Sequence, residues 1–473
     1  MTRPTLGVVV AVLLLAGSAA AQTSTATLTG TVRDSSGAVL PGVSLVVTDT
    51  LRGTSQSTMS NDTGNYTIPA LNPGTYSLAA ELTGFKKFLQ EGIVLQVNQV
   101  ARIDTETVSV TAATPLLETD TSSRGSVIDQ RKIVELPLNG RDYNQLALLS
   151  PGVLPGTPRL ASVNFKGVLN VNGNRTFNNV FLLDGVDNIS YSNSFRGENV
   201  QLVQPSVDAL QEFKIQTNAY SAEFGRSSGA VVNATIKSGT NAVHGSLYEF
   251  LRNDVLDANN FFSNALGAPK PVRKRNQFGA TAGGPIVHNK TFWFADYEGL
   301  RDREGVPRTR LVPTAAEKAG LFSTAVVDPF AAGRPEFSRN AAGQWVIPSN
   351  RWDAVGAKIV GLIPDPNVAG TTIFASTPIT SIRQDQFDAK VDHQFRQNLN
   401  LFGRYSFVDT NTFRPGPLPG LAEGSFNDAF GASLNRSQGL ALGLTWTFSP
   451  AGGAATTSRS RRTSASTEPA RSA

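Results

Sequence analysis

Few residues of this chain have the types and spacing that chemistry at a protein site requires. Asp184 and Asp187, separated by two residues, could offer carboxylate oxygens to a calcium ion. The rest of a calcium-loop pattern, including its distal glutamate, is missing, and Asp184-Gly185 is a pair typical of tight hairpin turns. The run 225–229 (GRSSG) lacks the Lys-Ser/Thr that completes a phosphate loop. We therefore predict a hairpin at Asp184-Gly185 and no metal site.

Nucleophiles and metal ligands are equally scarce elsewhere. The chain has no cysteine, which excludes disulfides, Cys-ligated zinc and a thiol nucleophile. Its three histidines, His244, His288 and His393, are scattered and form no HExxH pattern, and no GxSxG nucleophile elbow is present. We expect no catalytic residue, no cofactor and no enzymatic activity.

The net charge of +5 does not indicate a polyanion partner. Much of it lies at the two ends, on Arg3 and on four arginines of the last 23 residues, so the body of the chain is nearly neutral. The one dense basic run, residues 270–275 (KPVRKR), has no interleaved aromatic residue for base stacking. It is interpreted as a solvated loop, and no nucleic-acid partner is expected.

The first 21 residues have the pattern of a secretory signal peptide. Arg3 precedes an apolar run at 6–16, and Ala19-Ala20-Ala21 forms a small-residue cleavage site before Gln22. The apolar run is too short to span a bilayer of roughly 30 Å as a helix. We expect cleavage between Ala21 and Gln22 and export, in preference to a retained membrane anchor.

The elements that follow are predicted to be mostly β, because glycine (43) and proline (26) punctuate short alternating runs. Residues 22–104 read as strands joined by turns, which indicates a small antiparallel β-sandwich. The stretches GTVRDSSGAVLPGVSLVVTD and DTGNYTIPALNPGTYSLAAELTGFKK resemble the carboxypeptidase regulatory-like domain, a transthyretin-like sandwich. The resemblance implies a domain without chemistry, serving as a spacer or docking module in preference to a sugar-binding one.

A short extended segment, residues 105–114, follows this domain. Its alternating β-branched and small residues could add as a strand to a partner's sheet. It resembles the TonB box, by which TonB-dependent receptors engage the periplasmic energy-coupling protein, although the same residues could instead form the last strand of the sandwich. The residues concerned are Glu106, Thr107, Val108, Ser109, Val110, Thr111, Ala112 and Ala113.

Residues 115–240 are predicted to form a small α+β domain, with hairpin turns at Asn172-Gly173 and Asp184-Gly185 and a short helix from Val207. The stretches ELPLNGRDYNQLALLSPGV, FLLDGVDN and AYSAEFGRSSGAVVNATIKSGTN are similar to the plug of Oar-like TonB-dependent receptors. The resemblance implies a domain that closes a barrel lumen, where its charged residues pair with lumen-facing charges or are simply solvated. The candidate plug residues are Arg141, Arg175, Asp184, Gly185, Glu223, Gly225 and Arg226.

Residues 241–449 show the period-2 alternation of membrane strands. Apolar residues occupy one face of 440–448, and in 386–395 apolar residues alternate with Asp388, Lys390 and Asp392, which suit a wet lumen. Less regular strands are expected at 244–253, 277–286 and 290–300. The stretch RNQFGATAGGPIVHNKTFWFADYEGLR again resembles Oar-like receptors. Residues 301–383 are interpreted as a long extracellular loop with a helix at 352–362.

Only about six wall strands can be counted, whereas plugged transporters have about 22. After Pro450 the chain has no Leu, Ile, Val or aromatic residue, and residues 450–473 are interpreted as a disordered tail, possibly read out of frame.

Two functions are carried forward. The leading hypothesis is a fragment of a TonB-dependent receptor in the outer membrane of a Gram-negative-type bacterium, which binds or takes up a large nutrient such as an oligosaccharide or peptide. Its expected partners are a TonB-type protein, outer-membrane lipid and that ligand. The alternative is a secreted or periplasmic β-sandwich protein for binding or adhesion, without transport.

Overall fold

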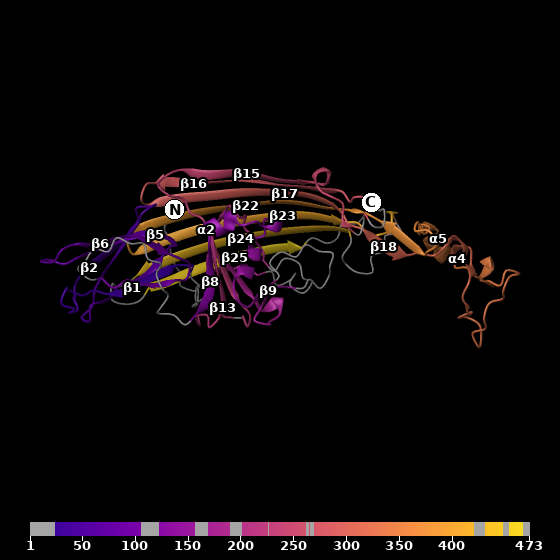
Figure 1. The fold of residues 1–473 in the computed structure, drawn as a ribbon, viewed down its shortest axis with the longest axis horizontal. Coiled ribbons are helices and arrows are strands. Elements are labelled where there is room, and N and C mark those ends of the chain that lie inside the picture. The colour runs from indigo at the N-terminus through magenta and orange to yellow at the C-terminus, as the bar shows by residue number, and fades with distance from the viewer. Residues whose placement is uncertain are drawn as a thin grey trace, which may run out of the picture.

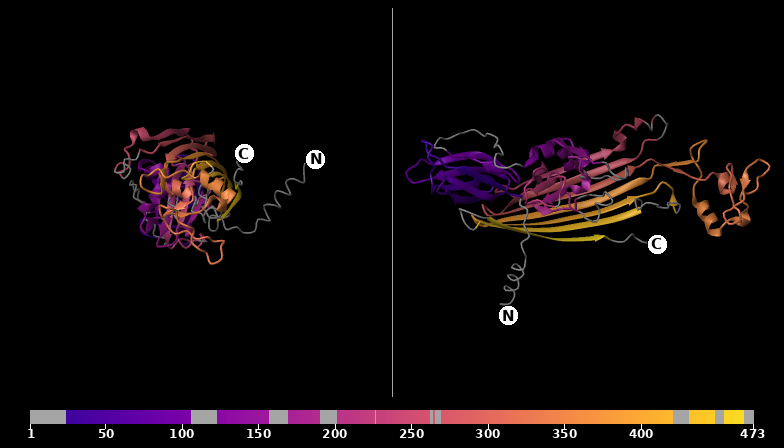
Figure 2. Two further views of the ribbon diagram at one scale, coloured as in Figure 1. Left: turned by 90° about the vertical axis from the view of Figure 1, so that its right-hand side faces the viewer. Right: turned by 90° about the horizontal axis from the view of Figure 1, so that it is seen from below.

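The computed structural model describes residues 24–105, 123–156, 169–189, 201–225, 227–261, 264, 269–420 and 431–447, together with the backbone of 454–466. Three units follow one another along the chain: an N-terminal sandwich, a plug, and a curved wall of long strands (Figure 1). The plug lies in the hollow of the wall, and the sandwich lies beside it at one end (Figure 2). None of the helices in the described ranges is long and apolar enough to cross a membrane.

The N-terminal sandwich packs a three-stranded sheet, in the order β4-β1-β7, on a four-stranded sheet, in the order β3-β2-β5-β6. Alternation along each strand buries one set of side chains between the sheets, among them Leu28, Leu45, Ile68 and Leu78. The predicted sandwich is therefore confirmed. Its strands are β1 Ala26–Thr31, β2 Ser44–Asp49, β3 Ser55–Met59, β4 Asn65–Leu71, β5 Gly74–Glu81, β6 Phe88–Leu95 and β7 Val100–Arg102.

The plug is built on a five-stranded sheet, in the order β12-β11-β14-β13-β8, with the short helix α2 (Gln130–Glu135) on one face. Its core holds Ile133, Phe181 and Phe213, and the buried Tyr143 donates its hydroxyl proton to Gln201 (2.8 Å). The sheet strands are β8 Arg124–Asp129, β11 Val180–Leu183, β12 Val186–Asp187, β13 Leu210–Asn218 and β14 Val231–Ile236, and a separate pair consists of β9 Val153–Pro155 and β10 Leu169–Val171.

Two predictions for the plug are wrong. The chain makes only a turn at 207–209 and then enters β13 at Leu210, because the apolar residues that follow are buried in the sheet. Asn172 and Gly173 have the positive φ values of a tight turn (50° and 76°), but β10 pairs with β9 and not with the strand after this turn. Both outcomes depend on which strands pair in the folded chain, and the turn residues alone do not determine that pairing.

The wall is a seven-stranded antiparallel sheet in the order β15-β16-β17-β22-β23-β24-β25. Within the described residues it is open, with β15 and β25 at its two edges. Its strands are β15 His244–Asn253, β16 Arg273–Val287, β17 Thr291–Gly305, β22 Ile379–Arg396, β23 Leu399–Arg414, β24 Gly431–Thr447 and β25 Ala454–Ser466.

Strand β25 corrects the prediction that all of residues 450–473 form a disordered tail. It pairs with β24 from Asn435↔Ser466 to Thr447↔Ala454. A ladder uses backbone donors and acceptors only, so a run without large apolar side chains can still join the edge of a sheet.

The predicted two-faced character of the wall is confirmed in β22. Asp388 and Lys390 on the concave face are 2% and 7% exposed, because the plug covers them. Phe387 and Val391 on the convex face are 38% and 42% exposed. An outward apolar band and an inward polar face are the pattern of an outer-membrane barrel wall.

The segment between β17 and β22 carries small elements of its own and projects beyond one end of the wall (Figure 1). It is shorter than the predicted loop 301–383, because β17 continues to Gly305 and β22 begins at Ile379. The predicted helix is present as α5 (Ala354–Leu362), whose N-cap Asp353 accepts the amide proton of Gly356. The other elements are β18 Arg308–Leu311 paired with β21 Ile373–Ser376, α4 Ala315–Lys318, and β19 Leu321–Phe322 paired with β20 Trp345–Val346.

Candidate functional site

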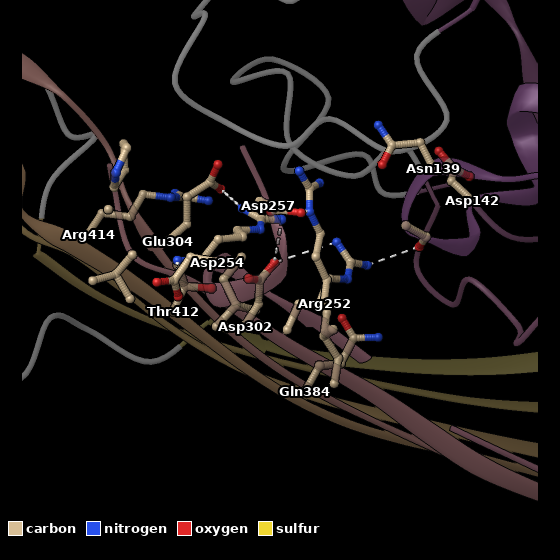
Figure 3. Close-up of a pocket in the computed structure, with 18 of the residues that line it drawn as sticks. Asn139, Asp142, Arg252, Asp254, Asp257, Asp302, Glu304, Gln384, Thr412 and Arg414 are labelled. Atoms are coloured by element: carbon tan, nitrogen blue, oxygen red, sulfur yellow. Dashed lines mark hydrogen bonds and ion pairs between the residues drawn. The ribbon is translucent and has the colours of Figure 1, made fainter. Parts of the chain in front are cut away.

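A cavity of about 890 Å³ lies between the plug and the concave face of the wall, at the end that carries the segment 306–378 (Figure 3). The plug contributes Asn139, Gly140 and Asp142 to its floor. Strands β16, β17 and β22–β24 supply most of its sides, and Arg252 of β15, the chain between β15 and β16, and Pro307 supply the rest. Such a concave space between two rigid units is a natural place for ligand binding.

One side of the cavity is charged. Arg273 and Arg275 of β16 lie directly opposite Glu304 and Asp302 of β17 in the ladder. Arg273 pairs with Glu304 and, at 3.2 Å, with Asp302, and Arg275 lies 3.5 Å from Asp302 (Figure 3). Cross-strand pairing of opposite charges therefore holds these side chains on the inner face.

These contacts correct the interpretation of the basic run 270–275 as a solvated loop at Arg273 and Arg275, whereas Lys270 and Lys274 are exposed. The strand β16 begins at Arg273, and the guanidinium groups of Arg273 and Arg275 face acidic partners within the cavity. The acidic residues that face Arg273 and Arg275 belong to β17. The local sequence of the basic run does not show that this strand lies beside it.

The opposite side of the cavity is rich in neutral hydrogen-bonding groups, with Arg414 of β23 as its charged residue. Gln384, Thr410 and Asn435 form one row across β22, β23 and β24, and Thr412 and Ser433 stand opposite each other in the next row on the same face. Adjacent strands are about 4.8 Å apart, so each row presents amide and hydroxyl groups at that spacing. None of the described residues that line the cavity is aromatic.

The floor of the cavity ties the plug to the wall. Arg275 donates to the backbone oxygen of Gly140 (3.0 Å), and Gly140 has a φ of 70°. A Cβ atom at this position would lie 3.0 Å from the Arg275 guanidinium, so a glycine is needed for this approach. The plug loop at the floor is therefore in direct contact with the charged side of the cavity.

Arg141, a predicted plug residue, is placed by both units. Its guanidinium pairs with Asp208 of the plug and lies over the rings of Tyr248 and Phe250 on β15, 4.8 and 4.1 Å from their centroids. The described contacts of Arg141 therefore join the plug to the first wall strand through cation–π attraction rather than through a lumen-facing carboxylate.

Asp184 carries the strongest electrostatic contact between plug and wall. It forms the predicted hairpin with Gly185 (φ 49° and 74°), between β11 and β12. Its buried carboxylate lies 3.0 Å from Lys390 Nζ and 3.3 Å from Arg404 Nε, which belong to β22 and β23. Its Oδ1 also accepts the amide proton of Ile236 (3.1 Å). The hairpin prediction is confirmed, and the turn presents an anion to two wall cations.

None of the predicted plug residues that the structure describes lines this cavity. Arg175, Glu223 and Gly225 are exposed on the plug. Arg226, residues 106–113 and the cleavage site at Ala21 and Gln22 lie outside the described residues. Where side chains are described, no group of three or more acidic or histidine residues is arranged to hold a metal ion. Arg275 and Asp302 line the cavity, although Asp302 was not predicted and Arg275 was assigned only to the basic run 270–275. The alternation of charged residues in β16 and β17 was the available signal.

Comparison with known families identifies two parts of the chain. Residues 27–109 match the carboxypeptidase regulatory-like domain, and residues 235–459 match the outer membrane beta barrel domain. These matches confirm the predicted carboxypeptidase regulatory-like domain and the predicted outer-membrane barrel wall. The wall is an outer-membrane β-barrel domain, and the chain is an outer-membrane protein of the Gram-negative type.

Comparison with individual proteins agrees. Over 319 residues the chain is 32% identical to the TonB-dependent transporter Oar of Myxococcus xanthus, an alignment that covers 62% of this chain and 28% of that protein. The chain thus spans less than a third of the length of this relative.

Among solved structures, a mutant of the ferric enterobactin receptor of Pseudomonas aeruginosa has a TM-score of 0.43 at 14% identity, covering 73% of this chain and 41% of that one. The outer membrane transporter YddB of Escherichia coli has a TM-score of 0.41 at 14% identity, covering 68% and 37%.

Proposed function

We propose that this chain, a homologue of the TonB-dependent transporter Oar with an outer-membrane β-barrel domain, forms the plug-bearing part of a TonB-dependent receptor that binds and takes up a nutrient. The observation that carries the proposal is the plug seated in the concave face of the wall, with the cavity on one side of it and the sandwich on the other. The proposed role is binding and uptake, not catalysis.

The lining of the cavity supports a ligand rich in hydroxyl groups. Gln384, Thr410 and Asn435 form a row of neutral donors and acceptors, which matches the regular hydroxyl groups of an oligosaccharide. The charged pairs around Asp302 can bind further hydroxyl groups without a net charge on the ligand. A peptide is the second candidate, favoured by the mixed charges of that same side.

The proposed partner is a TonB-type energy-coupling protein. Residues 106–113 follow Thr105 at the end of the sandwich and precede the plug strand β8, so a pull on them would act on both units. Deleting residues 106–113 is expected to abolish binding of the full chain to a TonB C-terminal domain. Unchanged binding would remove this segment from the proposal.

Ligand binding is tested by titrating the full chain in detergent with maltohexaose, xylohexaose and a tryptic peptide pool. We expect an oligosaccharide to bind, and Asn435→Ala to weaken it about tenfold through the loss of hydrogen bonds. Leu434→Ala is the control, because Leu434 is the neighbouring residue on the outward face. Equal effects of the two variants, or binding of peptides alone, would contradict an oligosaccharide site.

Cell fractionation separates the receptor from the alternative of a soluble binding protein. The receptor is expected only in detergent-solubilised outer membrane. Recovery as a soluble periplasmic protein would favour the alternative.

A further inference from the structure

A turn of the sandwich is buried against the plug. It consists of Gln96, Val97, Asn98 and Gln99, joins β6 to β7, and is called the latch turn below. The amide of Gln99 donates to the oxygen of Gln96 (3.2 Å), and the Gln99 side chain accepts the amide proton of Gln96 (2.8 Å). Asn98 has a φ of 52°, and Val97 is fully buried. The turn is therefore internally braced and presents its tip to the plug.

Three polar contacts join the latch turn to plug strands β13 and β14. Glu212 accepts the amide proton of Val97, and Lys214 Nζ donates to the backbone oxygen of Asn98 (3.1 Å). The side-chain amide of Asn233 donates to the side-chain oxygen of Asn98 (2.6 Å). Lys214 and Asn233 stand directly opposite each other in the ladder, so Asn98 bridges the two strands.

A second contact lies where the chain passes from the plug into the wall. Arg52 of the sandwich donates to the oxygen of Gly239 (3.3 Å), and Asn241 donates to the oxygens of Arg52 (2.8 Å) and Leu51 (3.1 Å). A Cβ atom on Gly239 would lie 2.4 Å from two backbone oxygens of the wall, which leaves this passage no spare room.

A third contact reaches the wall itself, next to the turn between β22 and β23. Gln394 and Gln397 donate to the backbone oxygen and the hydroxyl of Ser55 (3.1 and 3.3 Å), and Ser57 donates to Gln397 (3.0 Å). The sandwich is thus fastened to the plug, to the passage and to the wall at once.

These contacts are well suited to being broken and made again. Glu212 and Lys214 carry polar, ionisable groups, and water would solvate them once the surfaces separate. An apolar interface of the same size would instead expose hydrocarbon on opening, at a cost proportional to its area. A polar interface holds two domains in one orientation when it is closed, and separating it costs little free energy because water solvates the groups that are exposed.

The latch turn is also next to the point where the proposed partner pulls. Strand β7 follows it directly, pairs only with β1 among the strands that the structure describes, and ends three residues before Thr105. Beyond β7, Ile103 and Thr105 donate to the oxygens of Thr29 and Thr31 (2.8 and 2.9 Å). Tyr66 and Arg33 donate in turn to the oxygens of Ile103 and Thr105 (2.7 and 2.9 Å). A pull on the chain after Thr105 would break these bonds first and would then draw the latch turn away from the plug.

We infer that the N-terminal sandwich is a latch on the plug: its turn at 96–99 holds β13 and β14 in place, and its detachment precedes any movement of the plug. The inference rests on the proposed function, which supplies the pull. It gives the carboxypeptidase regulatory-like domain a mechanical role, because the bonds that must break first belong to this domain and not to the plug.

The test is hydrogen exchange on the full chain in detergent, read by mass spectrometry on β13 and β14. Asn98→Gly keeps the positive φ but removes the side-chain oxygen that Asn233 binds. We expect exchange in these strands to become about tenfold faster, the factor for one lost buried hydrogen bond. Ala70→Gly is the control, since Ala70 has a φ of 61° in the same sandwich and its methyl group makes no hydrogen bond.

A second variant guards against a folding defect. Lys214→Met keeps the unbranched apolar stem of the side chain and removes the donor to Asn98. Faster exchange in both variants, with heat-modifiability of the barrel retained, supports the latch. Unchanged exchange in both would overturn it. The measurement uses neither ligand nor TonB, so it is independent of whether the chain binds a nutrient, and a failure of the proposed function would show only in the titrations and the TonB-binding assay.

Discussion

Lys390 of the wall places its Nζ 3.0 Å from the carboxylate of Asp184 at the tip of a plug hairpin, and both side chains are buried. Arg404 approaches the same carboxylate from the next strand, at 3.3 Å. One anion of the plug thus pairs with two cations of the wall. A buried ion pair of this kind is costly to break from one side, because the partner charge stays in a medium that solvates it poorly.

Asp184→Asn is therefore expected to loosen the plug within the wall. Lys390 and Arg404 would lose their counter-charge, which costs about 3–5 kcal/mol for a buried pair broken from one side. Hydrogen exchange of the plug strands β11 and β14 at increasing urea concentration would measure it. Asp187→Asn on the same hairpin is the matched control, since Asp187 is only partly buried. If the free energy of unfolding falls no more than in the control, the ion pairs of Asp184 with Lys390 and Arg404 do not hold the plug in the wall.

Glu212 makes the contact between latch turn and plug sensitive to pH. Burial raises the pKa of Glu212 to about 7, against the opposing effects of its bond from Val97 and of nearby Lys214. The folded chain thus keeps a proton that the unfolded chain releases near pH 4.5. Stability should fall as pH rises from about 4.5 to 7, by about 3 kcal/mol, and level off above pH 7.

Glu212→Gln should remove this part of the pH dependence. The amide cannot ionise, so the difference in unfolding free energy between the variant and the wild type isolates the contribution of Glu212. Urea midpoints measured between pH 4.5 and 8 would give it. Parallel pH profiles for the two proteins would mean that Glu212 is not buried at this contact.

Gly140→Ala should separate the plug loop from Arg275. Alanine at a positive φ lowers the free energy of unfolding by about 1 kcal/mol. Loss of the hydrogen bond from Arg275 to the oxygen of residue 140 lowers it by about 1 kcal/mol more. Gly173→Ala is the control, because Gly173 has a φ of 76° with nothing within 4 Å of an added Cβ. Thermal unfolding of the two variants measures the difference. Equal destabilisation would show that the contact with Arg275 contributes nothing.

Arg141→Lys should weaken the contact between the plug and β15 although the charge is kept. The planar guanidinium lies 4.1 Å from the centroid of Phe250, and an ammonium group cannot stack in this way. We expect a loss of about 1 kcal/mol, read from hydrogen exchange in β15. Arg175→Lys, at an exposed position of the plug, should have no effect. If Arg141→Lys leaves hydrogen exchange in β15 unchanged, the stacking on the aromatic rings does not stabilise this contact. The ion pair with Asp208 is then the contact through which Arg141 acts.

Local patterns predicted the parts of the fold that depend on local chemistry. The alternation at 244–253 marked β15, and Asp184-Gly185 formed the expected turn because both residues accept a positive φ. The pairing of Arg275 with Asp302 depends on the register between β16 and β17, and the sequence alone does not determine that register. The contact of Asn98 with Lys214 and Asn233 joins two domains, so no local pattern could report it.

The ribbon formed by β18 and β21 has a consequence for how the wall can assemble. It continues the register of β17 and β22, since Gly305 faces Ile379 and, three residues on in each strand, Arg308 faces Ser376. The two long strands therefore meet as one extended hairpin, and only the residues beyond Leu311 and Ile373 form the inserted module. Lengthening a loop raises its closure entropy only logarithmically. The module can change in length and sequence during evolution while the register of the wall beneath it stays the same.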